Sequence, residues 1–186
     1  MAAIKDDVSL LEFLDLSQLN CLNESAEHPF ALIVSAKAVN TTTNYLLSDA
    51  DEQLLLNIPA SSRAFWRFNQ SVRVRSIVIK SSAGAQAPKG VKLLVNRPSI
   101  GFEDVEDAVE PEVAQILEIS EEDVKEGRPI ALRFVRFQAV TSLHIFVVSN
   151  QGGAEETRID SVDVLGVTVE TTKDLSGLKQ ADEHAH

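Results

Sequence analysis

Three stretches in the carboxyl-terminal part of the chain alternate apolar and polar residues with the period of a β-strand. They cover residues 130–137, 143–148 and 158–167. Because successive side chains of a strand point to opposite faces, each stretch presents one face to a core. Polar linkers separate the stretches, and the segment from Asn150 to Gly153 contains residues that accept the backbone angles of a turn. The pattern predicts a β-rich fold, and no catalytic group stands out in it.

Strand-like runs also occur earlier in the chain, at residues 53–58, 72–79 and 91–95. A short helix is predicted over residues 9–16, since Ser9 and Glu12 have the spacing of a capping box and leucines follow on one helical face. We expect that face to pack on the body of the protein. A second helical turn is predicted at residues 120–123, before Gly127.

Length and composition are those of one folded domain, with 186 residues, 44% hydrophobic residues and eight Phe. We expect an extension with the short helix at residues 1–21, a β-sandwich domain at 22–170 and a flexible tail at 171–186. No apolar run is long enough to cross a membrane, and the first residues lack the features of a secretory signal. The single cysteine, Cys21, fits a reducing compartment, so we expect the cytoplasm, with the nucleus as a second location.

Individual residues that could carry chemistry have a plainer structural interpretation. Cys21 has no nearby base and no CxxC partner, which favours a half-buried apolar residue over a reactive thiol. Asp49, Asp51 and Glu52 lack the glycine and glutamate of a calcium loop, which favours an acidic turn before a strand. His144 lies within a strand, where a surface or hydrogen-bonded core role is commoner than catalysis. We therefore predict no enzyme activity, no cofactor and no metal.

Charge is strongly segregated along the chain. Residues 60–100 contain eight bases and no acid, whereas residues 103–126 contain eleven acids and one base. Either the two segments neutralise each other across the fold, or each presents a patch to a partner. Phe65 and Trp66 lie among the bases, as in some single-strand nucleic-acid sites, but a net charge of −11 argues against nucleic acid. At the terminus, His184 and His186 could bind a metal held by a partner, or lie in a solvated tail.

Several motifs, in order along the chain, resemble those of the PITH domain, which is named from proteasome-interacting thioredoxins. The motifs are Cys21-Leu-Asn-Glu24, Ser48-Asp-Ala-Asp-Glu-Gln-Leu-Leu-Leu-Asn-Ile-Pro59, Asn96-Arg-Pro98, Phe102-Glu-Asp-Val105, Leu132-Arg-Phe-Val-Arg-Phe-Gln138, Ser142-Leu-His-Ile-Phe146, Asn150-Gln-Gly-Gly153 and Leu165-Gly166. Each motif alone is weak, but the ordered set extends over residues 9–167 and is specific.

The resemblance implies an all-β fold, a jelly-roll β-sandwich similar to galactose-binding domains, which agrees with the strand pattern. In the family, the domain often follows a thioredoxin domain and is associated with the regulatory particle of the proteasome. The present sequence has no CxxC motif and no preceding βαβ region, so the resemblance implies neither oxidoreductase activity nor, from fold alone, sugar binding. Residues 60–67 depart from the family pattern as an insertion, and residues 39–44 form a second candidate insertion.

These observations predict a monomeric, non-catalytic protein-binding module that docks on the regulatory particle of the 26S proteasome or an associated complex. They predict no nucleic-acid and no membrane partner. The expected contact residues are Arg63, Trp66, Arg67, Arg73, Arg75, Arg97, His184 and His186. The alternative is a lectin-like or small-ligand module, with Trp66 as the tryptophan of its site.

Overall fold

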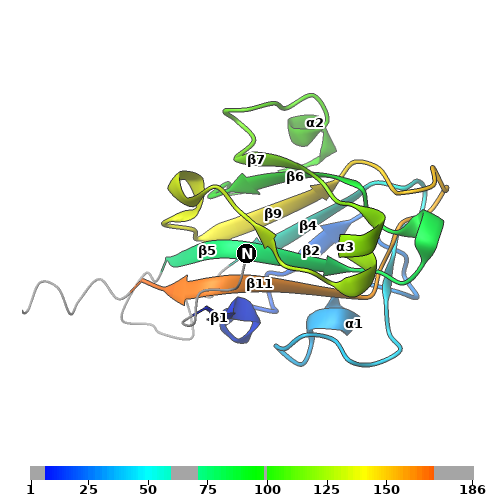
Figure 1. Cartoon of the computed structure of the whole chain (residues 1–186), viewed down its shortest axis with the longest axis horizontal. Coiled ribbons are helices and arrows are strands. Elements are labelled where there is room, and N and C mark those ends of the chain that lie inside the picture. Colours follow the sequence, from blue (N-terminus) through cyan, green and yellow to red (C-terminus); the bar gives the residue numbers. More distant parts are fainter. Residues whose placement is uncertain (1–6, 60–70, 99, 170–186) are drawn as a thin grey trace, which may run out of the picture.

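A computed structural model describes residues 7–59, 71–98 and 100–169 of the chain, and two antiparallel sheets face each other in it (Figure 1). The five-stranded sheet has the order β2 (Asn20–Leu22), β4 (Leu54–Pro59), β9 (Ser142–Val147), β6 (Gly90–Val95) and β7 (Gln115–Glu118). The four-stranded sheet has the order β1 (Val8–Ser9), β11 (Ser161–Thr168), β5 (Val72–Lys80) and β8 (Ile130–Ala131). The predicted jelly-roll β-sandwich is confirmed.

Short elements connect the two sheets. Strands β3 (Leu46–Leu47) and β10 (Arg158–Ile159) form a separate antiparallel pair. The helices are α1 (Ala31–Val34), α2 (Phe102–Val105) and α3 (Glu121–Glu126), with the 3-10 turns η1 (Leu10–Phe13), η2 (Gly84–Gln86) and η3 (Phe134–Phe137). None of the described helices has the length and apolar character that spanning a membrane requires.

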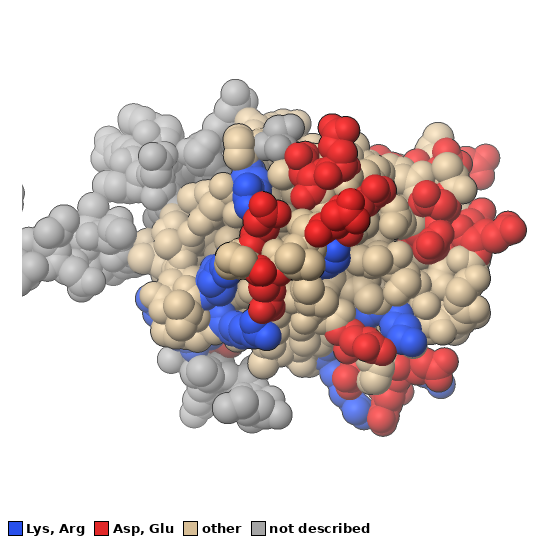
Figure 2. All heavy atoms as spheres, turned by 90° about the horizontal axis from the view of Figure 1, so that it is seen from above, with Lys and Arg blue, Asp and Glu red and all other residues tan. Residues whose placement is uncertain are grey.

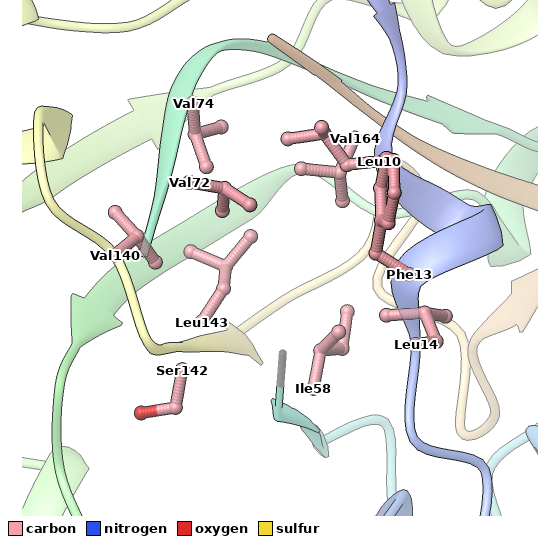
Figure 3. A pocket seen from close by; sticks show the side chains of 10 residues that line it. All are labelled: Leu10, Phe13, Leu14, Ile58, Val72, Val74, Val140, Ser142, Leu143 and Val164. Carbon is pink, nitrogen blue, oxygen red and sulfur yellow. The ribbon is translucent and has the colours of Figure 1, made fainter. Parts of the chain in front are cut away.

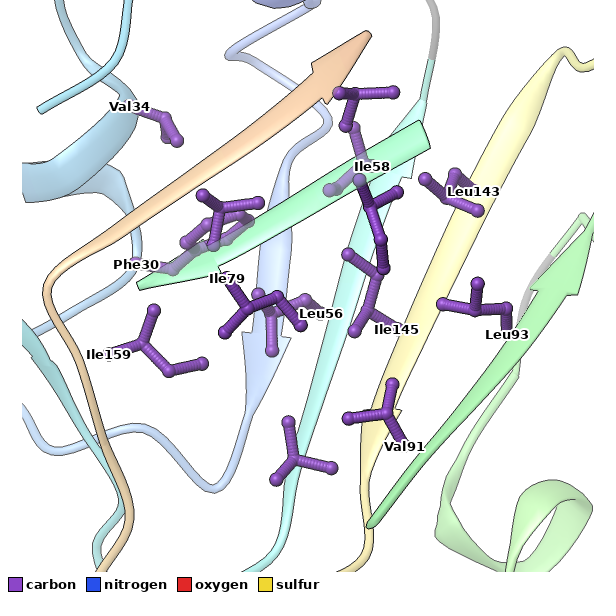
Figure 4. Close-up of a cluster of buried hydrophobic side chains, with 14 of the residues drawn as sticks. Phe30, Val34, Leu56, Ile58, Ile79, Val91, Leu93, Leu143, Ile145 and Ile159 are labelled. Atoms are coloured by element: carbon purple, nitrogen blue, oxygen red, sulfur yellow. The ribbon is translucent and has the colours of Figure 1, made fainter. Parts of the chain in front are cut away.

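The main core lies between the sheets. Leu56, Leu93 and Ile145 extend from the five-stranded sheet toward Ile79 of the four-stranded sheet, and all four side chains are almost completely buried (Figure 4). Burial of aliphatic side chains is the main favourable term in folding, at about 1.5–3 kcal/mol for each one. Alternation along the strands therefore selects the face on which the two sheets meet.

A β-bulge interrupts the alternation of β5. Val72 and Val74 face the core before it, and Ile77 and Ile79 face the core after it. The register skips Arg75, since Leu165 lies opposite Ser76 and Gly166 opposite Val74. The extra residue changes the phase of the strand, so apolar residues on both sides of it reach the same core.

The five-stranded sheet is also covered on part of its outer face. Leu55, Leu94 and Phe146 point away from the main core and form a second cluster with Val105 and Val113, from α2 and the following segment. Strand β9 is therefore buried on both faces, with Ile145 in one cluster and Phe146 in the other. Its continuous burial explains why its sequence is apolar at consecutive positions.

The predicted amino-terminal helix is present but short. The Ser9 hydroxyl accepts a 3.4 Å hydrogen bond from the backbone N–H of Leu11, and η1 ends at Phe13 because Leu14 returns to an extended conformation. Leu10, Phe13 and Leu14 lie over one end of the sandwich, where they surround a small apolar cavity of about 30 Å³ (Figure 3). As expected, the apolar face of this turn packs on the body of the protein.

Most predicted strands are confirmed, but the predicted strand at residues 130–137 is wrong over most of its length. Only Ile130–Ala131 pairs with β5. The chain then leaves the sheet, because the backbone N–H of Arg133 donates to the side-chain Oε1 of Gln115 at 2.8 Å, and η3 follows. The predicted helical turn at residues 120–123 is α3, capped by Ser120 and ended by Gly127 with φ 66°.

Candidate functional site

An apolar pair of side chains extends into solvent from η3, beside β5. Phe134 and Val135 are 56% and 78% exposed, whereas Phe137 at the end of the same turn is completely buried. Phe137 therefore anchors the turn in the core while the two preceding side chains stay outside. An exposed aromatic ring on an anchored turn can serve as an anchor in a protein-binding site, because aromatic residues are enriched at protein interfaces.

Arginines surround this pair. The guanidinium of Arg73 on β5 lies 5.6 Å from the ring centroid of Phe134, a cation–π contact. Arg133 forms a 2.7 Å ion pair with Glu110, and Arg136 donates to the backbone carbonyl of Pro111 at 2.7 Å. We call the five residues Arg73, Arg133, Phe134, Val135 and Arg136 the Phe134 surface. The contacts from Arg133 and Arg136 connect it to the segment between α2 and β7, which limits its movement.

In the described part of the structure, the arginines that the sequence analysis grouped together lie in different places. Arg73 belongs to the Phe134 surface, whereas Arg75 pairs with Asp7 at 3.2 Å and Arg97 lies beyond the end of β6. The other predicted contact residues, Arg63, Trp66, Arg67, His184 and His186, lie outside the described residues. For all of them a role in binding stays a prediction.

Two lysines of the basic segment form contacts within the fold. The ammonium of Lys92 on β6 donates to three backbone carbonyls, those of Val105, Glu106 and Ala108, at 3.1, 2.8 and 2.8 Å. It thereby holds the carboxyl end of α2, where backbone carbonyls lack partners within the helix. Lys89 pairs with Glu118 at 3.7 Å. Within the described residues, this is the one ion pair that joins the basic and the acidic segments.

Most acidic side chains near α2 are therefore free to face solvent. Figure 2 looks onto the side of the molecule that bears α2 and β7, and shows Asp and Glu gathered there with a smaller group of Lys and Arg beside them. The exposed acids of this region include Glu103, Asp104, Glu106 and Asp107. Neutralisation between the segments is thus slight, and the surface presents patches of both signs.

The isolated residues that the sequence singled out are structural. Cys21 is buried, and burial raises the pKa of its thiol well above the ordinary value, which disfavours the reactive thiolate. The Oδ1 of Asp51 accepts hydrogen bonds from Asn23 Nδ2 at 2.8 Å and from the backbone N–H of Gln53 at 2.9 Å, which forms the predicted turn. Burial lowers the pKa of His144. No group of three His, Cys, Asp or Glu side chains in the described chain is arranged to hold a metal ion.

The PITH domain, as a family, matches residues 2–183. The chain belongs to the PITH domain family. Thioredoxin-like protein 1 of Schizosaccharomyces pombe is 34% identical over 171 residues, which are 90% of this chain and 54% of that protein. PITH domain-containing protein 1 of Danio rerio is 32% identical over 161 residues, which are 86% of this chain and 70% of that protein. This PITH chain thus spans about half the length of the yeast relative.

Solved structures share the fold of this PITH chain. The family 32 CBM from C. perfringens NanJ, in complex with galactose, has a TM-score of 0.56 and 9% identity, covering 86% of this chain and 98% of its own. A fucolectin from Morone saxatilis has a TM-score of 0.52 and 7% identity, covering 88% and 48%. At these identities the likeness establishes the galactose-binding-like sandwich and no ligand.

Sequence analysis missed the Phe134 surface. Period-two alternation placed Phe134 on the buried face of a predicted strand, together with Ile130 and Leu132. The available signal was the family motif from Leu132 to Gln138, in which Arg133 and Arg136 lie three residues apart, so that in a strand Arg136 would share the face of Phe134. The buried face of a strand rarely carries an arginine, so the motif fits an exposed turn better.

Proposed function

We propose that this PITH chain is a non-catalytic protein-binding module that docks, through its Phe134 surface, on the regulatory particle of the 26S proteasome or on an associated complex. The observation that carries the proposal is the exposure of Phe134 and Val135 on an anchored turn among arginines. The family name, taken from proteasome-interacting thioredoxins, supports the choice of partner.

The composition of the surface suits a protein interface. Aromatic residues and arginine are enriched at the centres of interfaces, where a few side chains carry most of the binding free energy. Truncation of such an aromatic anchor costs about 2 kcal/mol or more, which is a loss of roughly thirtyfold in affinity. Phe134 is the aromatic candidate for that role, and Val135 extends the apolar area beside it.

The turn is held before any partner arrives. Phe137 is buried beneath it, and Arg133 and Arg136 are bonded to Glu110 and Pro111. Ordering a loop on binding lowers affinity, so an anchored turn retains more of the free energy of its contacts. The arginines also favour an acidic partner surface and make the association rate sensitive to salt.

Co-sedimentation with purified particles tests the proposal. The chain is incubated with the intact 26S proteasome, the isolated regulatory particle and the isolated core particle, and bound protein is measured after centrifugation. Binding is expected to the two samples that contain the regulatory particle, and the double variant Phe134→Ala, Val135→Ala is expected to bind at least about tenfold more weakly. The control variant Leu32→Ala, Val39→Ala removes exposed apolar side chains on and after α1 and is expected to bind like the wild type.

Two outcomes would contradict the proposal. Absence of binding to every particle rules out direct docking on the proteasome and leaves only an associated complex as the partner, and equal binding by both double variants excludes the Phe134 surface. Raising the salt concentration is expected to weaken binding, since Arg73, Arg133 and Arg136 surround the contact. A chain that ends at Thr172, assayed beside the full chain, tests the separate prediction that His184 and His186 contribute.

A further inference from the structure

A polar hollow of about 360 Å³ lies on the outer face of the five-stranded sheet. Its floor carries Asn20 of β2, Asn57 of β4 and His144 of β9. The register places Asn20 opposite Asn57, and Asn57 opposite His144, so the three side chains form a row across adjacent strands. A hollow of this size falls within the range of small-ligand sites, which begins at about 300 Å³.

Hydrogen bonds fix this row in place. Asn57 donates through Nδ2 to Asn20 Oδ1 at 2.7 Å, and its own Oδ1 lies 2.6 Å from His144 Nδ1. The other ring nitrogen of His144 lies 3.1 Å from Ser142 Oγ and 3.2 Å from the backbone oxygen of Arg97. The row therefore also holds the backbone of Arg97 at the margin of the hollow, and polar groups ordered in advance add little entropic cost to binding.

Hydrogen-bond donors remain free at the margin. Asn20 is exposed, and its Nδ2 donates to no described residue, because the contact with Asn57 uses its Oδ1. The guanidinium of Arg97 is exposed and forms no ion pair within the described chain. The described lining contains no Asp or Glu, although the chain has a net charge of −11. These features select a ligand that supplies a carboxylate and hydrogen-bond acceptors.

Most of the remaining wall is apolar, and Gln18 is the one further polar residue of the described lining. The apolar part is formed by Leu22, Ile58, Pro59, Pro98 and Ile100. The described lining includes no Phe, Tyr or Trp. An acidic peptide matches this combination of free donors and apolar wall, because it carries a carboxylate, main-chain amides and an apolar side chain.

We propose that the hollow binds a short acidic peptide segment. Its carboxylate pairs with the guanidinium of Arg97, a main-chain carbonyl accepts from Asn20 Nδ2, and an adjacent apolar side chain packs against Ile100. The site shares no residue with the Phe134 surface, so it stands or falls independently of the proposed docking on the proteasome.

Nuclear magnetic resonance titration of the full chain with synthetic peptides tests this site. The probe is acetyl-Gly-Leu-Asp-Leu-Gly-amide, and its Asn analogue lacks the carboxylate. The acidic peptide is expected to shift the side-chain amide signals of Asn20 and Asn57 saturably, with a Kd of about 1 mM. The Asn analogue and the variant Arg97→Ala are each expected to weaken binding at least about tenfold, because each removes one partner of the charged pair. Arg128→Ala, which removes the same charge from an exposed position after α3, is expected to bind normally.

A third peptide, the Asn analogue with a free terminal carboxylate, identifies the source of the carboxylate. Recovery of affinity with it shows that the site accepts a chain terminus as well as an acidic side chain. The proposal is overturned if no peptide shifts the signals up to about 10 mM, or if the Asp and Asn peptides bind equally. It is also overturned if galactose alone shifts them, since the hollow would then be a saccharide site.

Discussion

Replacement of Lys92 by Met should destabilise the protein although no part of the sandwich core changes. The ammonium donates to the carbonyls of Val105, Glu106 and Ala108, and a thioether of similar length donates to none of them. Water can solvate the carbonyl of the exposed Glu106, so two bonds remain to be counted. A hydrogen bond to a charged group contributes about 1.5–3 kcal/mol, and the lower value, taken because Lys92 is only half-buried, gives a loss of about 3 kcal/mol.

Thermal unfolding followed by circular dichroism measures this loss. For a domain of this size, about 3 kcal/mol corresponds to a decrease in Tm of roughly 6–12 °C. Lys89→Met is the matched control. Lys89 belongs to the same basic segment as Lys92 but makes only one exposed ion pair, with Glu118 at 3.7 Å. Such a pair contributes less than about 1 kcal/mol. Equal Tm values for the two variants would refute the assignment of Lys92 as the residue that holds α2.

Two further predictions concern the sheets. Gly166→Ala should cost about 2–3 kcal/mol in unfolding free energy by urea denaturation, since the added β-carbon would overlap the Arg73 carbonyl oxygen at the bulge. Gly101→Ala, where the nearest atom would be an ordinary 3.9 Å contact, should cost less, about 1 kcal/mol from the loss of a favourable N-cap residue of α2, and equal effects would contradict this. For His144, burial lowers the pKa in the folded state, so the unfolded chain binds the proton more readily. Stability should therefore fall as the pH drops below about 6.5, by up to about 1.4 kcal/mol per pH unit, and stay level above it. An unchanged pH profile in His144→Gln would contradict this assignment.

The sequence predicted the sandwich because alternation is strong where one face of a strand is buried. Leu143, Ile145 and Val147 of β9 all reach the main core, as their spacing indicates. Alternation does not report the length of a strand, because the backbone N–H of Arg133 donates to the side chain of Gln115 and not to a neighbouring strand, and Gln115 lies 18 residues earlier in the sequence. The predicted strand at residues 130–137 was wrong for that reason, and with it the burial of Phe134.

The functional surfaces were harder to predict, since they depend on which charged residues find partners. Arg73, Arg75, Lys92 and Arg97 look equivalent in sequence, as members of one basic segment. In the fold, Arg75 pairs with Asp7 and Lys92 holds carbonyl groups, whereas Arg73 packs against an exposed ring and Arg97 lies beside a hollow. Charge content left both neutralisation across the fold and patches for a partner open, and only tertiary contacts separate the exposed cations from those with structural contacts.

The outer face of the five-stranded sheet changes from apolar to polar over two residues on each of two strands. On β4, Leu55 lies under α2 while Asn57 forms the floor of the hollow, and on β9 the same division separates Phe146 from His144. Two residues of a strand span only about 7 Å, so the boundary is set by how far the connection between β6 and β7 extends over the sheet. Insertions or deletions in that connection would cover or uncover polar floor without altering the sandwich. Relatives that share this fold could thus diverge in what they bind through the length of one loop.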